Sequence, residues 1–332
     1  MLLSSKTTSS QTAPHSIHPS AHRLSRRTLL KGVGGLAAAS FVGGGAAVAG
    51  SAPAQAALNV AEHEDQGRMQ YYKLATPSIG WLPRVNVLLP DAYDASRRYP
   101  VLYLLHGGGE DYSTFDTKYD IRNHTAERDL IVVMPDGGAA GWYSDPESSN
   151  VGPRNWETFH VDELIPWVDA TFSTIAQPAG RAVSGFSMGG FGALKYAAKH
   201  PELFGSVSSH SGPADLRIQD GAVIHWANFT AGATDLKGGT IYGIPWDQAR
   251  VSADNPVEHV ESYRGKRIFL VCGTESDRYE SIVLPSQQNF EKALDGAGIG
   301  YERYEDTGTH IVRWGRVQQD IDSMLNFLPK AG

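Results

Sequence analysis

A serine at position 187 stands in the pentapeptide Gly-Phe-Ser-Met-Gly (185–189), which fits the pattern G-x-S-x-G. The residues before it (181–185) have the composition of a short buried strand, and residues 188–199 have that of a helix. A turn this tight leaves no room for side chains at the flanking positions, and it raises the serine hydroxyl above a sheet at a helix N-terminus. The pattern therefore predicts that Ser187 is a nucleophile.

A serine hydroxyl needs a base to take its proton, and in this type of turn the base follows later in the chain. His310 lies in the expected place, after the last predicted strand (301–304) and before the closing helix (312–328). We therefore predict that His310 is the base. A loop histidine on the surface is the alternative.

The third member of such a constellation is a carboxylate that orients the imidazole and stabilises its charged form. The loop Gly-Thr-Glu-Ser-Asp (273–277) follows the strand predicted at 266–272 and offers Asp277 and Glu275. We predict Asp277, with Glu275 as the alternative.

The run His106-Gly-Gly-Gly109 follows another buried strand, Pro100–Leu105. Backbone N–H groups approach a developing oxyanion closely only where side chains are absent. We therefore predict that the oxyanion hole consists of the N–H groups of Gly108 and of Met188, the residue after the nucleophile. We expect His106 itself to brace the loop and to transfer no proton.

Apolar segments alternate with helical patterns along the chain, which is typical of a mainly parallel sheet with helices on both faces. Continuous apolar runs such as Pro100–Leu105 and Leu130–Met134 suit central strands that are buried on both sides. Helical spacing is also present in Trp156–Phe172 and Ser286–Leu294. The expected fold class is α/β, of the α/β-hydrolase type. An irregular insertion over residues 213–264, after the sixth strand, would form a lid or a pocket wall.

The first 56 residues contain no Asp or Glu and include the twin-arginine pattern Ser25-Arg26-Arg27. A Gly- and Ala-rich run follows and ends in Ala54-Gln55-Ala56, a small-x-small cleavage pattern. We expect a twin-arginine export signal that is removed, which would leave residues 57–332 as one catalytic domain outside the cytoplasm. An uncleaved membrane anchor is the alternative.

Without the signal, the chain would carry 24 basic and 36 acidic side chains, a net charge of −12. Such a surface repels nucleic acid, and no basic cluster reverses this. We therefore expect no nucleic-acid partner, and no stable membrane span once the signal is gone. The single cysteine, Cys272, excludes an internal disulfide. No His, Cys or Asp cluster has the spacing of metal ligands, so no metal or other cofactor is expected.

Several further runs carry a resemblance that covers nearly all of residues 57–332. They are YLLHGGGEDY (103–112), VVMPDGG (132–138), WYSDPES (142–148), NWETF (155–159), GFSMGGFGAL (185–194) and HPELFGSVSSHSG (200–212). With them, the chain resembles the esterase D/antigen 85-type family of α/β-hydrolases. In the antigen 85 mycolyltransferases the acid lies in a Cys-Gly-containing loop ending in a Ser-Asp-like pair, which favours Asp277. The resemblance also implies that Trp142, Tyr143 and Trp156 contact an acyl or aryl group at the mouth of the site. Ordinary core packing is the alternative for all three.

One departure from the mycolyltransferases bears on function. They carry Asp-Gly-Leu-Arg, whose Asp and Arg help to hold trehalose, where this chain has His106-Gly-Gly-Gly109. His-Gly is what the plain esterases of the family show. We therefore expect a secreted serine esterase that hydrolyses carboxylic esters, with a small-molecule, lipid or aryl ester as substrate. An acyltransferase of the mycolyl or diacylglycerol type is one alternative, and a non-catalytic wall-binding protein on the same scaffold is another.

Overall fold

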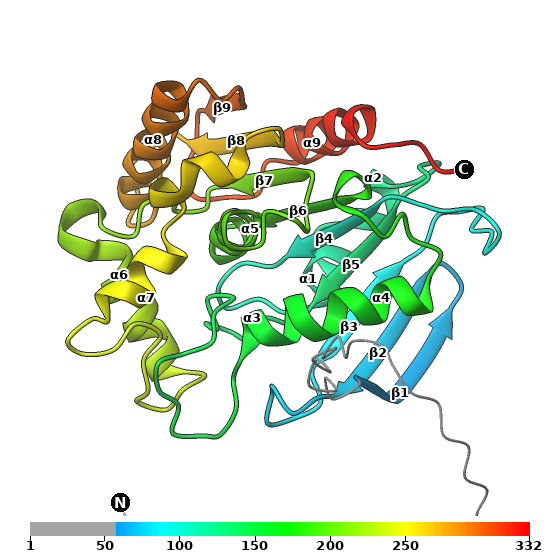
Figure 1. Ribbon diagram of the computed structural model, residues 1–332, viewed down its shortest axis with the longest axis horizontal. Coiled ribbons are helices and arrows are strands. Elements are labelled where there is room, and N and C mark those ends of the chain that lie inside the picture. The colour runs from blue at the N-terminus through cyan, green and yellow to red at the C-terminus, as the bar shows by residue number, and fades with distance from the viewer. Residues whose placement is uncertain (1–57) are drawn as a thin grey trace, which may run out of the picture. The chain divides into compact units, whose positions relative to one another are not determined.

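The computed structural model describes residues 58–332. The predicted export signal, residues 1–56, lies outside them. Within residues 58–332, nine strands form one sheet in the order β1-β2-β3-β5-β4-β6-β7-β8-β9 (Figure 1). The strands are β1 (Asn59–Gln66), β2 (Met69–Ala75), β3 (Arg84–Leu88), β4 (Val101–Leu105), β5 (Ile131–Pro135), β6 (Arg181–Phe186), β7 (Ser206–His210), β8 (Arg267–Gly273) and β9 (Glu302–Asp306).

From β5 to β9 all neighbouring strands run parallel, whereas β1, β2 and β3 form an antiparallel end. The α/β-hydrolase fold class expected from the sequence is therefore confirmed. The strands predicted at 100–105, 130–134, 181–185, 266–272 and 301–304 correspond to β4, β5, β6, β8 and β9. The hairpin β1–β2 was not predicted, because β1 (NVAEHEDQ) is exposed along its whole length and shows no apolar alternation.

Helices cover both faces of the sheet. They are α1 (Thr114–Thr117), α2 (Ile121–His124), α3 (Trp156–Thr158), the π-helical segment η1 (Phe159–Leu164), α4 (Ile165–Thr171), α5 (Met188–Lys199), α6 (Ile218–Ala233), α7 (Gln248–Asp254), α8 (Glu280–Ala297) and α9 (Trp314–Phe327), with 3₁₀ turns at Pro178–Gly180 and Pro256–Tyr263. The predicted helix over Trp156–Phe172 is thus present as α3, η1 and α4 in succession.

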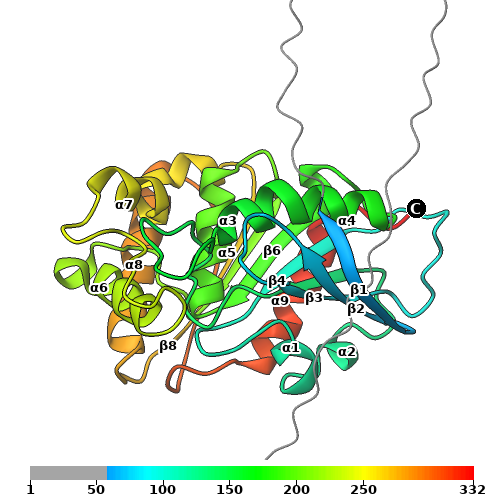
Figure 2. The ribbon, with the colours of Figure 1, turned by 90° about the horizontal axis from the view of Figure 1, so that it is seen from below.

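Alternating side chains of the central strands pack into two separate hydrophobic cores, one on each face of the sheet. Val101, Tyr103 and Leu105 of β4 face the core under α3–α4, α5 and α8. Leu102 and Leu104 face the other, under α1, α2 and α9. Figure 2 shows α3 and α4 on one side of the sheet and α9 with α1 and α2 on the other. A strand whose two faces are both covered reads as a continuous apolar run, which is why β4 and β5 were evident in the sequence.

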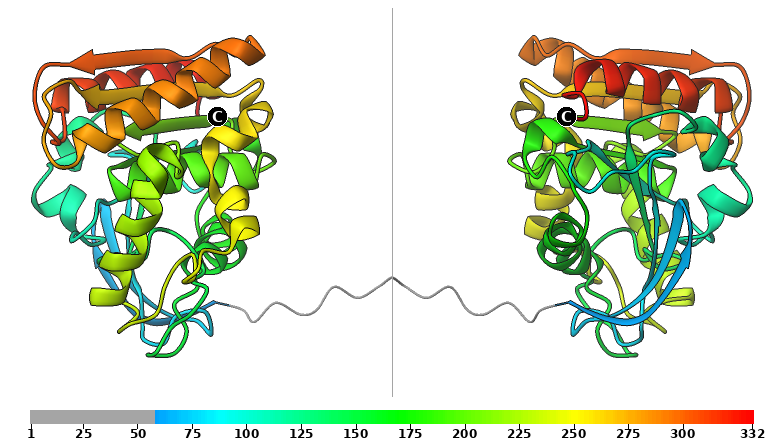
Figure 3. Two further views of the ribbon diagram at one scale, coloured as in Figure 1. Left: turned by 90° about the vertical axis from the view of Figure 1, so that its left-hand side faces the viewer. Right: turned by 90° about the vertical axis from the view of Figure 1, so that its right-hand side faces the viewer.

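The insertion over residues 213–264 contains α6, α7 and a 3₁₀ turn, and the left-hand view of Figure 3 faces α6 and α7. It follows β7, which is the seventh strand within residues 58–332 and not the sixth as expected. Ser148 and Thr240 pair as an antiparallel bridge and attach the insertion to the 142–150 loop. Within residues 58–332, no helix is both long and apolar enough to cross a membrane.

Candidate active site

Ser187 occupies the turn between β6 and α5 in a strained backbone conformation, with φ 54° and ψ −117°. The flanking glycines are required by close approach: a Cβ on Gly189 would lie 2.0 Å from the carbonyl oxygen of Leu105, and one on Gly185 2.4 Å from the Gly189 backbone. The Ser187 N–H donates to the carbonyl of His210 at 2.8 Å. Strain that is fixed in this way by its surroundings is typical of functional positions.

The structure brings His310 to Ser187. The loop between β9 and α9 carries the imidazole, and its Nε2 lies 2.7 Å from the Ser187 hydroxyl oxygen. Both side chains are largely buried. Sequence order and spacing were therefore enough to find this pair.

The carboxylate that faces the imidazole belongs to Glu280, the first residue of α8. Its Oε1 lies 3.3 Å from Nδ1 of His310. This is a close contact rather than a well-formed hydrogen bond, and Nδ1 has no other partner among the described residues. Catalytic hydrogen bonds in ligand-free enzymes are commonly long or poorly aligned and tighten when substrate binds.

The surroundings of Glu280 keep its carboxyl group ionised. The side chain is 1% exposed, and burial by itself raises the pKa of a carboxyl group. His310 and the hydroxyl of Ser211, which donates to Oε1 at 2.6 Å, outweigh this effect and hold the pKa of Glu280 below its ordinary value. The thiol of Cys272 donates to Oε2 at 3.2 Å. Cys272 is thus a buried partner of the carboxylate.

Asp277 does not occupy the position predicted for it. Its carboxylate accepts backbone hydrogen bonds from Tyr279, Glu280 and His310 at 2.8, 2.7 and 3.1 Å, and none of these reaches the imidazole ring. It stabilises the start of α8 and the backbone of the histidine loop. Glu275, the alternative acid, is exposed. In the structure, the carboxylate beside the imidazole is instead that of Glu280, one turn further along and on a helix.

A signal for Glu280 was present in the sequence. Glu280, Val283, Gln287, Phe290 and Leu294 recur at helical spacing, and all five are buried in α8. A carboxylate at the start of such a buried stripe is unusual, because burying it without partners is costly. That position, rather than the nearest acidic residue after the strand, indicates the partner of His310.

The run His106–Gly109 lies between β4 and α1. His106 is fully buried; its Nε2 accepts from the Gly137 N–H at 2.9 Å, and its carbonyl accepts from the Tyr143 hydroxyl at 2.9 Å. It therefore joins the loops that follow β4 and β5, as a bracing residue would. Gly108 and Met188, the predicted oxyanion donors, line the same cavity as Ser187. Met188 opens α5, so its N–H has no acceptor within the helix.

A cavity of about 610 Å³ opens over Ser187 and His310. Most of its wall is apolar or aromatic, and α6 of the insertion contributes one side. The lining includes Gly108, Glu110, Tyr119, Ala139, Ala140, Trp142, Phe186, Met188, Trp226, Thr230, Thr234, Tyr279, Ile311 and Val312. The insertion thus contributes residues of α6 to the wall of this cavity.

Of the three aromatic residues expected at the mouth of the site, only Trp142 lines this cavity. Its indole N–H donates to Thr230 of α6 at 3.0 Å. Tyr143 and Trp156 are fully buried and belong to the core. Core packing, the alternative interpretation, holds for both, and the Tyr143 hydroxyl donates to the His106 carbonyl.

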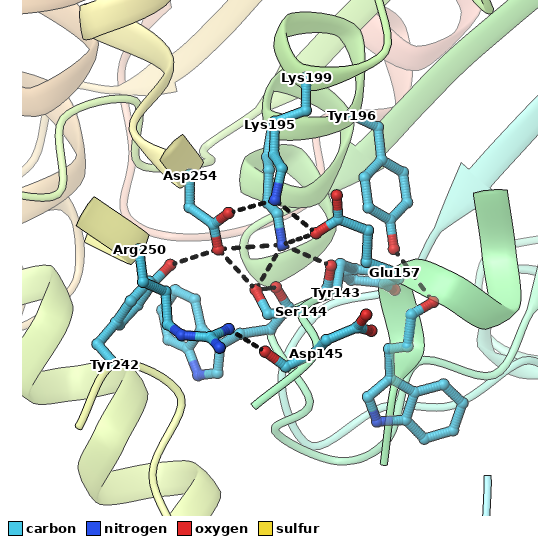
Figure 4. Close-up of polar contacts among 12 residues, drawn as sticks. Tyr143, Ser144, Asp145, Glu157, Lys195, Tyr196, Lys199, Tyr242, Arg250 and Asp254 are labelled. Carbon is cyan, nitrogen blue, oxygen red and sulfur yellow. Dashed lines mark hydrogen bonds and ion pairs between the residues drawn. The ribbon is translucent and has the colours of Figure 1, made fainter. Parts of the chain in front are cut away.

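A second group of buried charges lies on the C-terminal half of α5 (Figure 4). Lys195 is completely buried and contacts Glu157 at 2.8 Å and Asp254 at 3.1 Å. Its ammonium also donates to the Tyr143 carbonyl at 3.0 Å and to the Ser144 hydroxyl at 2.7 Å. Lys199, one turn later, contacts the same two carboxylates. This ion cluster was not predicted. It joins α5, α3, α7 and the 142–145 loop.

Comparison with known proteins places the chain in a family. Residues 76–328 match the family model described as "Putative esterase". The chain belongs to this esterase family. It is 56% identical over 277 residues to an esterase of Mycobacterium tuberculosis (strain H37Rv), a match that covers 80% of this chain and 60% of that protein's length.

Two further comparisons are with a more distant relative in sequence and with a solved structure of similar fold. The diacylglycerol acyltransferase/mycolyltransferase Ag85A of Mycobacterium bovis is 29% identical over 339 residues, which cover 93% of this chain and 94% of that protein. The solved structure of an S-formylglutathione hydrolase from Agrobacterium tumefaciens superposes with a TM-score of 0.65 at 19% identity, over 82% of this chain and 100% of that one. The higher identity to the esterase agrees with a chain that is closer to plain esterases than to mycolyltransferases.

Proposed function

We propose that the protein is a serine carboxylic ester hydrolase that works through an acyl-enzyme. The observation that carries this proposal is the 2.7 Å contact between the Ser187 hydroxyl and His310 Nε2 on the wall of a largely apolar cavity. A nucleophile, a base within hydrogen-bond reach and a carboxylate beside the base form the arrangement required for acyl transfer.

In the first half-reaction, Ser187 Oγ attacks the ester carbonyl while His310 Nε2 takes the hydroxyl proton. The oxyanion that forms accepts hydrogen bonds from the N–H groups of Gly108 and Met188. Collapse of this intermediate breaks the ester C–O bond, and His310 returns its proton to the departing alcohol. In the second half-reaction, His310 takes a proton from water, which attacks the acyl carbonyl. Collapse of this second intermediate breaks the bond between the acyl carbon and Ser187 Oγ, His310 returns the proton to Ser187, and the acid leaves.

We assign the role of orienting carboxylate to Glu280 in place of Asp277. An ionised Glu280 at Nδ1 favours the tautomer with the proton on Nδ1 and leaves Nε2 free to accept from Ser187. The lowered pKa of Glu280 supports this role, because the carboxylate must stay charged while the imidazole gains a proton.

The apolar cavity suits the acyl or aryl part of an ester, with Trp142 and Trp226 as side walls.

Labelling with a fluorophosphonate probe tests the nucleophile directly. We expect wild type to be labelled and Ser187→Ala not to be labelled. Labelling of neither would favour the non-catalytic binding protein, and equal labelling of both would contradict the assignment of Ser187 as the nucleophile.

Acyl transfer to an alcohol is the second candidate, and the 29% identity to Ag85A across 93% of this chain is the observation in its favour. His106 and Gly109 stand where the resemblance expects the trehalose-holding Asp and Arg, which favours water as the acceptor. Product analysis with one acyl donor and added trehalose or diacylglycerol separates the two. Predominant free acid supports hydrolysis, and a predominant transferred product contradicts it.

We also propose export by the twin-arginine route, on the strength of Arg26 and Arg27 and the small-x-small pattern that ends at Ala56. The exported protein should begin near residue 57 by mass spectrometry. Substitution of both arginines by lysine should retain the full-length chain in the cell. A protein found outside the cell with residues 1–56 intact would contradict this.

A further inference from the structure

The residue that follows the His106–Gly109 run, Glu110, turns back onto it. The carboxylate oxygen Oε2 of Glu110 accepts from the Gly107 N–H at 3.0 Å, and the Glu110 N–H donates to the Gly107 carbonyl at 3.2 Å. Because His106 Nε2 accepts from the Gly137 N–H, Nδ1 carries the proton of the neutral ring and donates to the same carbonyl at 2.8 Å. Both polar backbone groups of Gly107 are therefore fixed, and Glu110 contacts both.

These contacts fix the peptide group that contains the Gly108 N–H. The bond between Gly107 and Gly108 is trans, so the Gly107 carbonyl and the Gly108 N–H lie in one plane and point in opposite directions. Two donors hold the carbonyl, whereas the Gly108 N–H donates to no other group among residues 58–332. Gly108 lines the cavity over Ser187. The free N–H thus belongs to a peptide whose orientation is set from its other side.

The Glu110 carboxylate is itself held in place. Its Oε1 accepts from the Tyr119 hydroxyl and from the Lys118 ammonium, each at 2.9 Å, and the side chain is only 14% exposed. The Lys118 charge also offsets that of Glu110, which would otherwise oppose a negative charge that develops nearby. A carboxylate in this position holds the Gly107 N–H with a charge-assisted hydrogen bond, which is stronger than a neutral one.

Gly107 also lies against the nucleophile turn. A Cβ on Gly107 would lie 3.1 Å from the Phe186 ring and 3.1 Å from Glu110 Oε2, so a side chain there would displace one of the two. The two predicted oxyanion donors differ in how they are held. Met188 belongs to α5, and the helix fixes its N–H, whereas Gly108 lies in a loop without regular secondary structure. The loop donor therefore depends on side chains for its position.

We propose that Glu110 is a positioning residue for the oxyanion hole, and that its bond to the Gly107 N–H holds the Gly108 N–H on the oxyanion formed at Ser187. The assignment rests on the proposed ester hydrolysis. Oxyanion donors act only when they are preorganised at about 2.7 to 3.1 Å from the charged oxygen, so a small shift of the loop weakens them. Because the oxyanion exists in the transition state and not in the bound ester, loss of Glu110 should lower kcat and leave KM almost unchanged.

Three substitutions separate the hydrogen bond from the charge. Glu110→Gln removes the charge but keeps an oxygen within reach of the Gly107 N–H, Glu110→Asp keeps the charge but is one methylene shorter, and Glu110→Ala removes both. With 4-nitrophenyl acetate, kcat should fall about 10- to 100-fold in Glu110→Asp and Glu110→Ala, less than for outright loss of an oxyanion donor. Glu110→Gln should lose less than about fivefold. Glu127→Gln is the matched control and should change nothing, because its exposed side chain precedes β5, at the amino ends of the parallel strands.

A trifluoromethyl ketone with a ¹³C-labelled carbonyl reports on the oxyanion hole itself. Ser187 Oγ bonds to the carbonyl carbon, the serine proton passes to His310, and the carbonyl oxygen becomes the oxyanion of a reversible hemiketal. The NMR shift of the labelled carbon follows the ionisation of that oxygen as the pH is varied. The midpoint should lie about one pH unit higher in Glu110→Asp than in wild type, because a misplaced donor stabilises the charged oxygen less. A purely structural role would lower thermal stability and leave the midpoint unchanged.

The comparison of Glu110→Gln with Glu110→Asp decides the assignment even if Glu110→Ala does not fold, since both keep a polar side chain at this position. The assignment is overturned if Glu110→Asp keeps full activity, if the loss lies in KM, if Glu110→Gln loses more than Glu110→Asp, or if the hemiketal midpoint does not move. All of these results presuppose an active wild type. A wild type that does not hydrolyse 4-nitrophenyl acetate would instead overturn the proposed ester hydrolysis, and this assignment with it.

Discussion

The two ends of α5 hold buried charges in opposite ways. At its N-terminus, Ser187 is strained, its partner His310 has an imperfectly paired Nδ1, and both open onto a cavity. At its C-terminal half, Lys195 is closed off completely and meets two carboxylates, a hydroxyl and a carbonyl. Figure 4 shows how these groups converge on the Lys195 ammonium.

Both groups are buried, so burial does not distinguish the catalytic residues from the structural ion pairs. They differ in how completely their polar atoms are paired. A catalytic group needs access to substrate and a proton that can move, so it is not surrounded by a full set of fixed partners. A structural ion pair is stable only when every donor and acceptor is satisfied, because desolvation otherwise exceeds the attraction. The N-terminus of α5 thus lies at the catalytic cavity, whereas its C-terminal half is fixed to neighbouring elements by the ion cluster.

The largest effect should come from Glu280→Gln. Loss of the carboxylate removes the group that fixes the His310 tautomer, and kcat should fall by about 10²- to 10⁴-fold. Steady-state kinetics with 4-nitrophenyl acetate measures this. Thermal unfolding serves as the control, because the variant must remain folded for the comparison to count. A fall of less than fivefold would mean that Glu280 is not the orienting acid.

Lys195→Met should act on stability instead. Glu157 and Asp254 would lose their buried partner, and removing one member of a buried pair typically costs about 3 to 5 kcal/mol. Lys199→Met is the matched control, since Lys199 contacts the same carboxylates from a partly exposed position and should cost less. Denaturant unfolding measures both. Equal and small losses of unfolding free energy in the two variants would contradict the view that Lys195 stabilises the ion cluster at the C-terminal half of α5.

His160, which packs against Tyr196 of α5, should make the stability of the fold depend on pH, with an effect of intermediate size. Its Nε2 donates to the Asp136 carbonyl at 2.8 Å, and its Nδ1 lies 2.9 Å from the Tyr196 hydroxyl. Burial lowers the pKa of His160 to about 3. Below pH ~6.5 the unfolded chain therefore binds a proton that the folded chain does not, and stability falls as the pH falls towards 3.

Between pH 6.5 and 4.5 this group should remove about 2 kcal/mol from the free energy of unfolding. His160→Gln should reduce the slope of stability against pH over that range, whatever its effect on absolute stability. Urea unfolding at a series of pH values measures the slope. The pKa of Glu157 is held well below its usual range, because Lys195 and its other partners outweigh the effect of burial, so its contribution is lost only at lower pH. Identical slopes in the two proteins would show that His160 is not the titrating group.

The same division separates the features that could be predicted from the sequence from those that could not. Ser187, His310 and the bounds of α5 were accessible because chain order and glycine spacing constrain them locally. Glu280 was not predicted, because its contact with His310 depends on which side of α8 faces the histidine loop. The β1–β2 hairpin and the Lys195 cluster depend on contacts between distant segments, and neither leaves an apolar pattern. Resemblance alone placed Tyr143 and Trp156 in the pocket, and the structure places them in the core.

The smallest effect expected is that of Asp277→Asn, which contrasts with its neighbour Glu280. Asp277 accepts backbone hydrogen bonds at the start of α8, so the substitution should cost about 1 kcal/mol, as for the loss of a helix cap. Its pKa is lowered by the backbone N–H groups of Glu280, His310 and Tyr279, which outweigh burial, so this contribution to stability is present above pH ~4 and is lost as the pH falls through the lowered value. At pH 7, kcat should fall by less than tenfold, because Asp277 supports the backbone of the histidine loop and does not contact the ring. Kinetics and thermal unfolding on the same preparation, beside Glu280→Gln, measure both quantities. If Asp277→Asn lost more activity than Glu280→Gln, the acid would have to be reassigned to the residue that the sequence first indicated.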